Sequence, residues 1–197
     1  MTTRFVTGIV LAAGASRRLG TAKQLLPYRN TTVLGATLEV VRSCALDQII
    51  ITLGGTATAV RRHVDLAGLD VTVAGDFGSG CSSSLRSAMS AVDSRAAGIV
   101  LMLGDQPGLS AATVDRLVTE GTSTAITVCH YRDGVGHPFW LSRSVFGELT
   151  RLHGDKAVWK IIESGRHRVS RLDIDAPIPL DVDTWDDYAR LRAATSP

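Results

Sequence analysis

An apolar run near the start of the chain, residues 5–11, passes directly into a loop of small and basic residues. The run has the length and the β-branched content of a buried strand. Small residues at the start of the loop let backbone N–H groups approach an anion closely, and these residues are Ala12, Ala13 and Gly14. Arg18 and Lys23 add positive charge. The sequence therefore predicts a buried strand that ends in a binding loop for a triphosphate.

The loop matches neither of two common nucleotide-binding motifs. A Walker loop needs Ser or Thr directly after its lysine, whereas Lys23 is followed by Gln24. Gly14 and Gly20 do not fit the dinucleotide-binding pattern G-x-G-x-x-G. We therefore expect a phosphate-binding loop of a different class. An ordinary strand-to-helix turn with two surface cations is the structural alternative.

Strand-like and helix-like segments alternate along the rest of the chain. The expected strands after the first cover residues 48–53, 70–74, 98–103, 125–131, 137–141 and 166–173. This alternation predicts an α/β fold, a three-layer, Rossmann-like, mostly parallel sheet with helices on both faces. A chain of 197 residues fits a single domain, 1–197, in which residues 125–141 form a small β-ribbon.

Composition excludes several classes of protein. The net charge of +2 is too balanced to predict a nucleic-acid-binding surface, and no apolar run reaches the ~18–20 residues of a membrane-spanning helix. Residues 1–4 lead directly into the first expected strand, without a secretory apolar segment. The three cysteines form neither a disulfide nor a zinc pattern. We therefore expect a cytoplasmic protein that binds neither nucleic acid nor membranes.

Asp105 follows residues 98–103, the most apolar of the expected strands and hence the expected centre of the sheet. Open α/β sheets bind ligands at the carboxyl ends of such strands. Mg²⁺ prefers one or two carboxylates together with phosphate oxygens, so Asp105 is the best candidate metal ligand. Because Asp105 and Pro107 are also typical turn residues, a purely structural turn is the alternative.

Other polar residues follow further expected strands. Ser82 and Ser84 lie in a Gly- and Ser-rich loop that opens into a helix, where they can bind a nucleotide or cap the helix. His137 precedes Pro138 and can offer a directed hydrogen bond to a substrate, or form an ordinary turn. Asp183 can bring a second carboxylate to the metal, or stabilise the start of the last helix.

The spaced pattern G-x-S-x-R-x-G-x-x-K resembles the signature of the MobA-like NTP transferase family, and here it consists of Gly14, Ser16, Arg18, Gly20 and Lys23. Leu-Ala-Ala-Gly and Lys-Gln-Leu-Leu-Pro look most like the branch that transfers CMP to molybdopterin. The guanylyl-transferring branch typically has Ala-Gly-Gly where this chain has Ala-Ala-Gly. The resemblance implies the nucleotide-diphospho-sugar transferase fold, with the β-ribbon as a substrate-side insertion.

The resemblance also implies roles for later segments. Gly-x-Ser-x-Ser-Leu-Arg corresponds to the nucleotide-binding segment, and Leu-Gly-Asp-Gln-Pro to the metal-binding one. The acceptor would be bound by Gly136, His137, Pro138 and Asp155, and the metal by Asp105 and Asp183. The family commonly continues after Asp155 with Gly-Ala-Arg, whereas this chain has Lys-Ala-Val, so the acceptor end departs from the pattern.

The implied reaction is a Mg²⁺-dependent transfer of CMP from CTP to a phosphate of molybdopterin, with release of pyrophosphate. Its catalytic residues would be Arg18, Lys23 and Asp105. The nucleotide would be bound by Ala12, Ala13, Gly14, Arg18, Lys23, Ser82, Ser84 and Asp105. A molybdenum hydroxylase is a candidate partner protein.

Three alternatives stay open. The same fold can act on another phosphorylated acceptor, such as a sugar phosphate, a methylerythritol phosphate or phospholactate. An NAD(P)-binding oxidoreductase is disfavoured, because the second expected strand ends in Gly54-Gly55 rather than in an acidic residue. A non-catalytic protein that delivers molybdopterin to a dehydrogenase would bind the same ligands without turnover.

Overall fold

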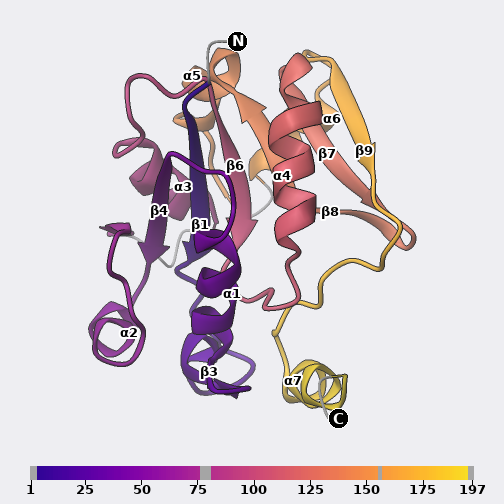
Figure 1. Ribbon diagram of the computed structural model, residues 1–197. Coiled ribbons are helices and arrows are strands. Elements are labelled where there is room, and N and C mark those ends of the chain that lie inside the picture. The colour runs from indigo at the N-terminus through magenta and orange to yellow at the C-terminus, as the bar shows by residue number, and fades with distance from the viewer. Residues whose placement is uncertain (1–3, 76–80, 155–156, 195–197) are drawn as a thin grey trace.

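Strand β1 (Val6–Ala12) lies inside a seven-stranded sheet with the strand order β5-β4-β1-β6-β8-β7-β9. This computed structural model describes residues 4–75, 81–154 and 157–194 (Figure 1). The other strands of the sheet are β4 (Gln48–Leu53), β5 (Asp70–Val73), β6 (Gly98–Leu103), β7 (Ile126–Tyr131), β8 (Gly134–Ser142) and β9 (Val169–Asp173). Two short strands, β2 (Pro27–Tyr28) and β3 (Thr31–Thr32), form a separate hairpin.

Strand directions in the sheet are mostly parallel, as the alternating sequence predicts. β1 pairs in parallel with both β4 and β6, and β5 and β9 are parallel to their neighbours. β8 runs antiparallel to β6 and β7. The registers Ala12↔Leu53 and Leu11↔Leu103 place the carboxyl ends of β1, β4 and β6 at one edge. Loops that follow these three strands therefore meet there.

Helices cover both faces of the sheet (Figure 1). Alternate residues of β1 enter different cores, with Val10 facing one and Ile9 the other. The Val10 side is covered by α1 (Val33–Arg42), α2 (Ala57–His63) and α4 (Ala111–Glu120). The Ile9 side is covered by α3 (Cys81–Met89), α5 (Phe146–Leu149) and α6 (Ala157–Glu163). Burial on both faces explains why the β1 sequence is a continuous apolar run instead of an alternating one.

The expected β-ribbon forms, but it is an integral part of the main sheet. Strands β7 and β8 make an antiparallel pair, and β8 also pairs with central β6 through Leu101↔Phe139. Phe139 and Trp140 are 0% and 1% exposed, so both faces of β8 are covered. β8 is therefore paired along both of its edges and covered on both of its faces. A strand in an insertion that projects from the sheet would lack the pairing with β6.

The last helix, α7 (Trp185–Ala193), lies beside the segment that follows β1. Its Tyr188 and Leu191 pack in one small core with Leu19 and Leu26. The Tyr188 hydroxyl donates to the Pro27 carbonyl at 2.6 Å. Thr184 and Asp187 form the capping box that the sequence predicts at the start of this helix. The end of the chain is thereby attached to its beginning.

In the described part of the chain, no helix is both long and apolar enough to span a membrane.

We expect Gly98→Ala to lower the free energy of unfolding by about 1–3 kcal/mol, because a side chain at this position overpacks the core. An added Cβ would lie 2.3 Å from Cη2 of Trp140 and 2.8 Å from the carbonyl oxygen of Leu141. Urea unfolding followed by circular dichroism measures the loss. Gly147→Ala is the matched control, because no atom lies within 4 Å of its added Cβ. Equal stabilities for the two variants would contradict this packing argument.

Candidate active site

The loop after β1 is held in shape by its own side chains. Ser16 adopts a positive φ of 50°, and its carbonyl accepts the N–H groups of Leu19 and Gly20 at 3.1 Å. Its hydroxyl oxygen accepts the N–H of Lys23 at 3.0 Å. Gly20 has a φ of 66°, a conformation that favours glycine. These bonds turn the chain back so that the Lys23 side chain returns to the end of β1.

Lys23, Asp105 and Asp183 form one ion-pair cluster at the carboxyl edge of the sheet. The Lys23 ammonium contacts the Asp105 carboxylate and lies 2.7 Å from Oδ1 of Asp183. Arg18 donates from Nη2 to the other Asp183 oxygen at 3.0 Å. The side chains of Lys23 and Asp105 are 12% and 15% exposed, whereas Arg18 is 69% exposed. The cationic loop and the acidic strand end therefore meet, as the proposed nucleotide site requires.

Backbone contacts bring the C-terminal segment to Asp105. The N–H of Val182 donates to the Asp105 carbonyl at 3.2 Å. The amide of Gln106, 2% exposed, donates to the Pro179 carbonyl at 3.1 Å. Val182 is fully buried in the same small core as α7. The turn after β6 thus anchors residues 179–182, and Asp183 follows directly from that anchor.

The charges of the cluster shift the pKa values of Lys23, Asp183 and the nearby Asp181. Burial lowers the pKa of Lys23, but the charge of Asp105 and hydrogen bonds to Asp105 and Asp183 outweigh it, so the pKa is raised. The hydrogen bond from Lys23 lowers the pKa of Asp183. Loss of hydration, followed by the charge of Asp105, raises the pKa of Asp181 to about 6. Asp181 therefore adds a third acidic group beside the two candidate metal ligands.

The two carboxylates fit a divalent metal ion that is shared with phosphate groups. Asp105 and Asp183 already contact a single cationic atom, the Lys23 ammonium nitrogen, so their oxygens converge on one point. Among the described residues, no group of three or more His, Cys, Asp or Glu side chains is arranged to hold a metal. Mg²⁺ typically takes one or two carboxylates and completes its shell with water and phosphate oxygens. The donor set therefore suits such a shared ion.

Three predicted acceptor residues, Gly136, His137 and Pro138, lie at the same edge on the neighbouring strand. Because β8 runs against β6 with Leu101 opposite Phe139, His137 lies toward the Asp105 end. Its ring stacks on Phe139 with centroids 4.2 Å apart, and its carbonyl accepts the Tyr131 hydroxyl at 2.7 Å. Gly136 packs against Ile178, and the bond between His137 and Pro138 is cis. Among the described residues, none of these three hydrogen-bonds to the Lys23 cluster.

The remaining predicted site residues are Asp155 and those expected to bind the nucleotide. Ser82 and Ser84 lie in the first turn of α3 and are 1% and 5% exposed. The loop before them, residues 76–80, falls outside the described residues, as does Asp155. Ala12 ends β1, and Ala13 and Gly14 follow it at the cluster. A Cβ on Gly14 would lie 3.5 Å from Cε of Lys23, so the loop backbone is close to that side chain.

Sequence reasoning missed one residue of this site, Gln24. Its side chain is 2% exposed and bonds to two backbone carbonyls of the loop. The signal in the sequence was a polar residue inside the otherwise apolar run that follows Lys23. That signal is weak, because a surface glutamine gives the same pattern.

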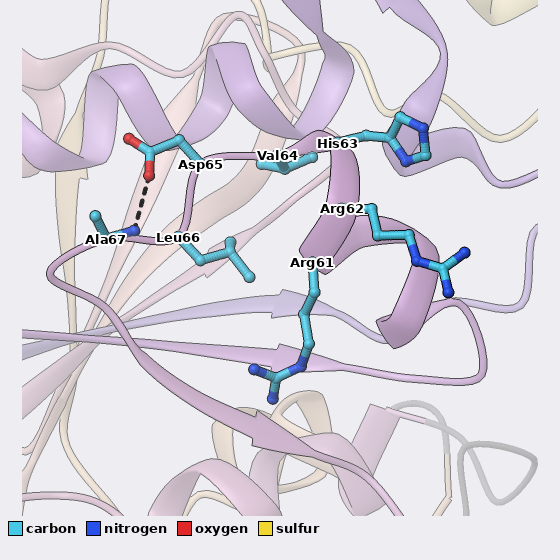
Figure 2. A pocket seen from close by; sticks show the side chains of 7 residues that line it. All are labelled: Arg61, Arg62, His63, Val64, Asp65, Leu66 and Ala67. Carbon is cyan, nitrogen blue, oxygen red and sulfur yellow. Dashed lines mark hydrogen bonds between the residues drawn. The ribbon is translucent and has the colours of Figure 1, made fainter.

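A separate pocket lies at the end of α2, and none of these residues lines it (Figure 2). It is an open hollow lined by residues 61–67. Figure 2 shows Arg61 and Arg62 extending in different directions, so their guanidinium groups do not converge on a ligand. Arg42 donates to the carbonyls of Asp65 and Ala67 and ties this turn to α1. We interpret the hollow as a feature of the surface turn.

Comparison with known proteins gives consistent matches over most of the chain. Residues 8–170 match the model of the MobA-like NTP transferase domain. Nicotine blue oxidoreductase of Paenarthrobacter nicotinovorans is 37% identical and covers 94% of this chain and 96% of that protein. Molybdenum cofactor cytidylyltransferase of Escherichia coli is 25% identical and covers 91% of this chain and 92% of that protein.

Solved structures similar to this chain share its fold. Rv0371c from Mycobacterium tuberculosis is 62% identical, with a TM-score of 0.94, covering 98% of this chain and 100% of that one. A structure of Rv0371c in complex with manganese is 58% identical, with a TM-score of 0.89 and the same coverage. The sheet and its flanking helices are those of the nucleotide-diphospho-sugar transferase fold. By its sequence, its fold and the match over residues 8–170, the chain belongs to the MobA-like NTP transferase family.

Proposed function

We propose that this protein is a cytoplasmic, Mg²⁺-dependent cytidylyltransferase that transfers CMP from CTP to a phosphate of a molybdopterin-type acceptor. The observation that carries the proposal is the contact of Lys23 with Asp105 and Asp183, because it joins a cationic loop to two carboxylates. Membership of a nucleotidyltransferase family supports the reaction class. The Leu-Ala-Ala-Gly loop and the similarity to the Escherichia coli cytidylyltransferase support CTP and molybdopterin.

The proposed reaction requires positioning and charge neutralisation. An acceptor phosphate oxygen attacks the α-phosphorus of CTP, the new P–O bond forms, and the bond to the leaving pyrophosphate breaks. Arg18 and Lys23 bind the triphosphate and stabilise the charge that develops on pyrophosphate. The Lys23 ammonium has three N–H donors and contacts two carboxylates, so in this proposal its third donor binds a phosphate oxygen of the nucleotide. A divalent ion on Asp105 and Asp183 would neutralise phosphate charge.

The acceptor binds, in this proposal, on the side of β8, where Gly136, His137 and Pro138 lie. Burial lowers the pKa of His137 to about 4, so its imidazole is neutral at physiological pH. A neutral imidazole can donate one hydrogen bond and accept another, which suits a pterin edge or a phosphate. Ser82, Ser84 and Asp155 remain proposed ligands of the nucleotide and the acceptor. A molybdenum hydroxylase that receives the product is the proposed partner.

A second candidate function is favoured by one relative. Nicotine blue oxidoreductase, 37% identical, is named for redox chemistry, so an NAD(P)-dependent reaction on the same fold is the competing proposal. The loop after β1 lacks the dinucleotide-binding glycine pattern, and β4 is followed by Gly54-Gly55 without an acidic residue for a ribose. These features favour a triphosphate over a dinucleotide.

We expect calorimetric titration with Mg²⁺ present to give at least ~10-fold tighter binding for CTP than for GTP, ATP or NADPH, a difference of about 1.4 kcal/mol. The reason is that the loop and cluster are suited to a triphosphate and the Leu-Ala-Ala-Gly sequence to cytidylyl transfer. NADPH as the tightest ligand would support the oxidoreductase instead. Equal binding of CTP, GTP and ATP would contradict the proposed nucleotide.

We expect Asp105→Asn to reduce pyrophosphate release from CTP and molybdopterin by ~100-fold or more, since a carboxylate is replaced by a weaker metal ligand of the same shape. The coupled pyrophosphate assay measures the loss, and manganese titration by electron paramagnetic resonance measures the metal affinity. Asp175→Asn is the matched control, because that side chain is 91% exposed and pairs with Arg132. Activity within twofold of wild type for Asp105→Asn would contradict the metal role.

We expect the His137 ring to titrate near pH 4 by NMR, well below an ordinary histidine near 6.5. Because its folded pKa is lowered, the unfolded chain binds the proton first, and stability falls as pH drops from about 6.5 to 4. His137→Asn should remove up to about 3 kcal/mol of this pH-dependent loss, measured by urea unfolding at pH 7 and pH 4.5. An unchanged pH dependence in the variant would contradict the burial of a neutral ring.

A further inference from the structure

Gln24 is a buried polar side chain directly beneath the loop that follows β1. Its side-chain nitrogen donates to the carbonyl of Ala12 at 2.9 Å and to that of Gly14 at 3.1 Å. The side chain is 2% exposed, and its carbonyl oxygen is buried without a hydrogen-bond partner in the described structure. An unpartnered buried polar atom costs about 1–3 kcal/mol, so an apolar residue would serve better if this position only filled space.

The two bonds determine how the loop backbone is turned. In a trans peptide the C=O of one residue and the N–H of the next point in opposite directions. The cis bond recorded in the described chain is at His137–Pro138, so the loop peptides are trans. Because Gln24 binds the carbonyls of Ala12 and Gly14, the N–H groups of Ala13 and Ala15 point away from Gln24.

The N–H of Ala13 points to the side of β1 on which Asp105 lies. The Leu11 carbonyl accepts the N–H of Gly104, on the β6 side of β1. Carbonyls alternate along a strand, so the Ala12 carbonyl points to the other side and the N–H of Ala13 points to the β6 side, where Asp105 follows the strand. In the part of the chain that the structure describes, no acceptor is recorded for the N–H groups of Ala13 and Ala15.

We propose that Gln24 is a positioning residue that orients the N–H groups of Ala13 and Ala15 as a pair of donors for phosphate oxygens of the nucleotide. This inference rests on the proposed nucleotide function and assigns to Gln24 the orientation of its triphosphate-binding loop. A side-chain amide suits the task, because one planar nitrogen supplies two donors and carries no charge into a buried site. Glutamate lacks both donors, and methionine has the same length without them.

Gln24→Met tests this role with inorganic tripolyphosphate as the probe, titrated in the presence of Mg²⁺. We expect the variant to bind tripolyphosphate at least ~10-fold more weakly than wild type by calorimetry. In ¹H–¹⁵N NMR spectra of the wild-type protein, tripolyphosphate should shift the amide signals of Ala13 and Ala15. In the variant these shifts should be lost, a change that a purely structural role for Gln24 would not produce.

Gln48→Met is the matched control. Gln48 is also a glutamine whose amide donates to a backbone carbonyl, that of Ala91 at 2.9 Å. It begins β4, at the opposite end of the strand from the cluster, so its loss should lower stability and leave tripolyphosphate binding unchanged. The wild-type NMR titration keeps the proposal testable even if Gln24→Met does not fold.

The outcomes separate the two proposals. Tripolyphosphate binding by wild type without shifts at Ala13 and Ala15, or equal binding by Gln24→Met, would overturn the role of Gln24 and leave the nucleotide site standing. No binding by wild type would overturn the nucleotide site itself, and with it this inference. Loss of binding together with loss of the two amide shifts in Gln24→Met, but not in Gln48→Met, would establish the role.

Discussion

The ion-pair cluster around the Lys23 ammonium is the interaction on which the candidate site depends. The charge of Lys23 is shared by two carboxylates from segments far apart in the sequence, Asp105 and Asp183. Removing one partner from such a buried pair costs about 3–5 kcal/mol, because the other charge is left uncompensated. With Lys23 and Asp105 only 12% and 15% exposed, the candidate site is held together by the charges that the proposed reaction uses.

The parallel sheet explains why these charges can meet. Strands β1 and β6 are adjacent and parallel, so the loops that follow them begin side by side. The third segment, which carries Asp183, is not a strand of the sheet. Its position comes from the hydrogen bond between Val182 and Asp105 and from the packing of α7 against the residues after β1. Three segments far apart in the sequence therefore meet at this edge, at Lys23, Asp105 and Asp183.

The family of this chain is shown by the match to a family model, whereas its substrate is a proposal. The match over residues 8–170 shows a nucleotidyltransferase family, whereas a relative at 37% identity is named an oxidoreductase. One fold can carry different chemistry because function depends on the side chains at the site. In the proposed function, the Lys23 cluster would bind a triphosphate with a metal ion, and His137 on β8 would offer a neutral group to an acceptor.

Patterns within single segments were readable from the sequence. The apolar run of β1, the order of strands and helices, the central place of β6 and the capping box at Thr184 all follow from local periodicity and from residue type. The β7–β8 hairpin was also expected, but its place inside the main sheet was not. Pairing with β6 depends on which strand lies next to which, and local periodicity carries no information on that.

Sequence alone thus determined the class of fold and the chemical types present at the site, since these follow from hydrophobic period and from residue identity. Tertiary structure alone decided that one ammonium group serves two carboxylates, and that Gln24 turns inward to bind Ala12 and Gly14. A polar side chain near a loop can face water or the backbone with the same sequence pattern. Only the packing of α1, α2 and the end of β1 around Gln24 settles the direction, because packing decides which groups lose their water.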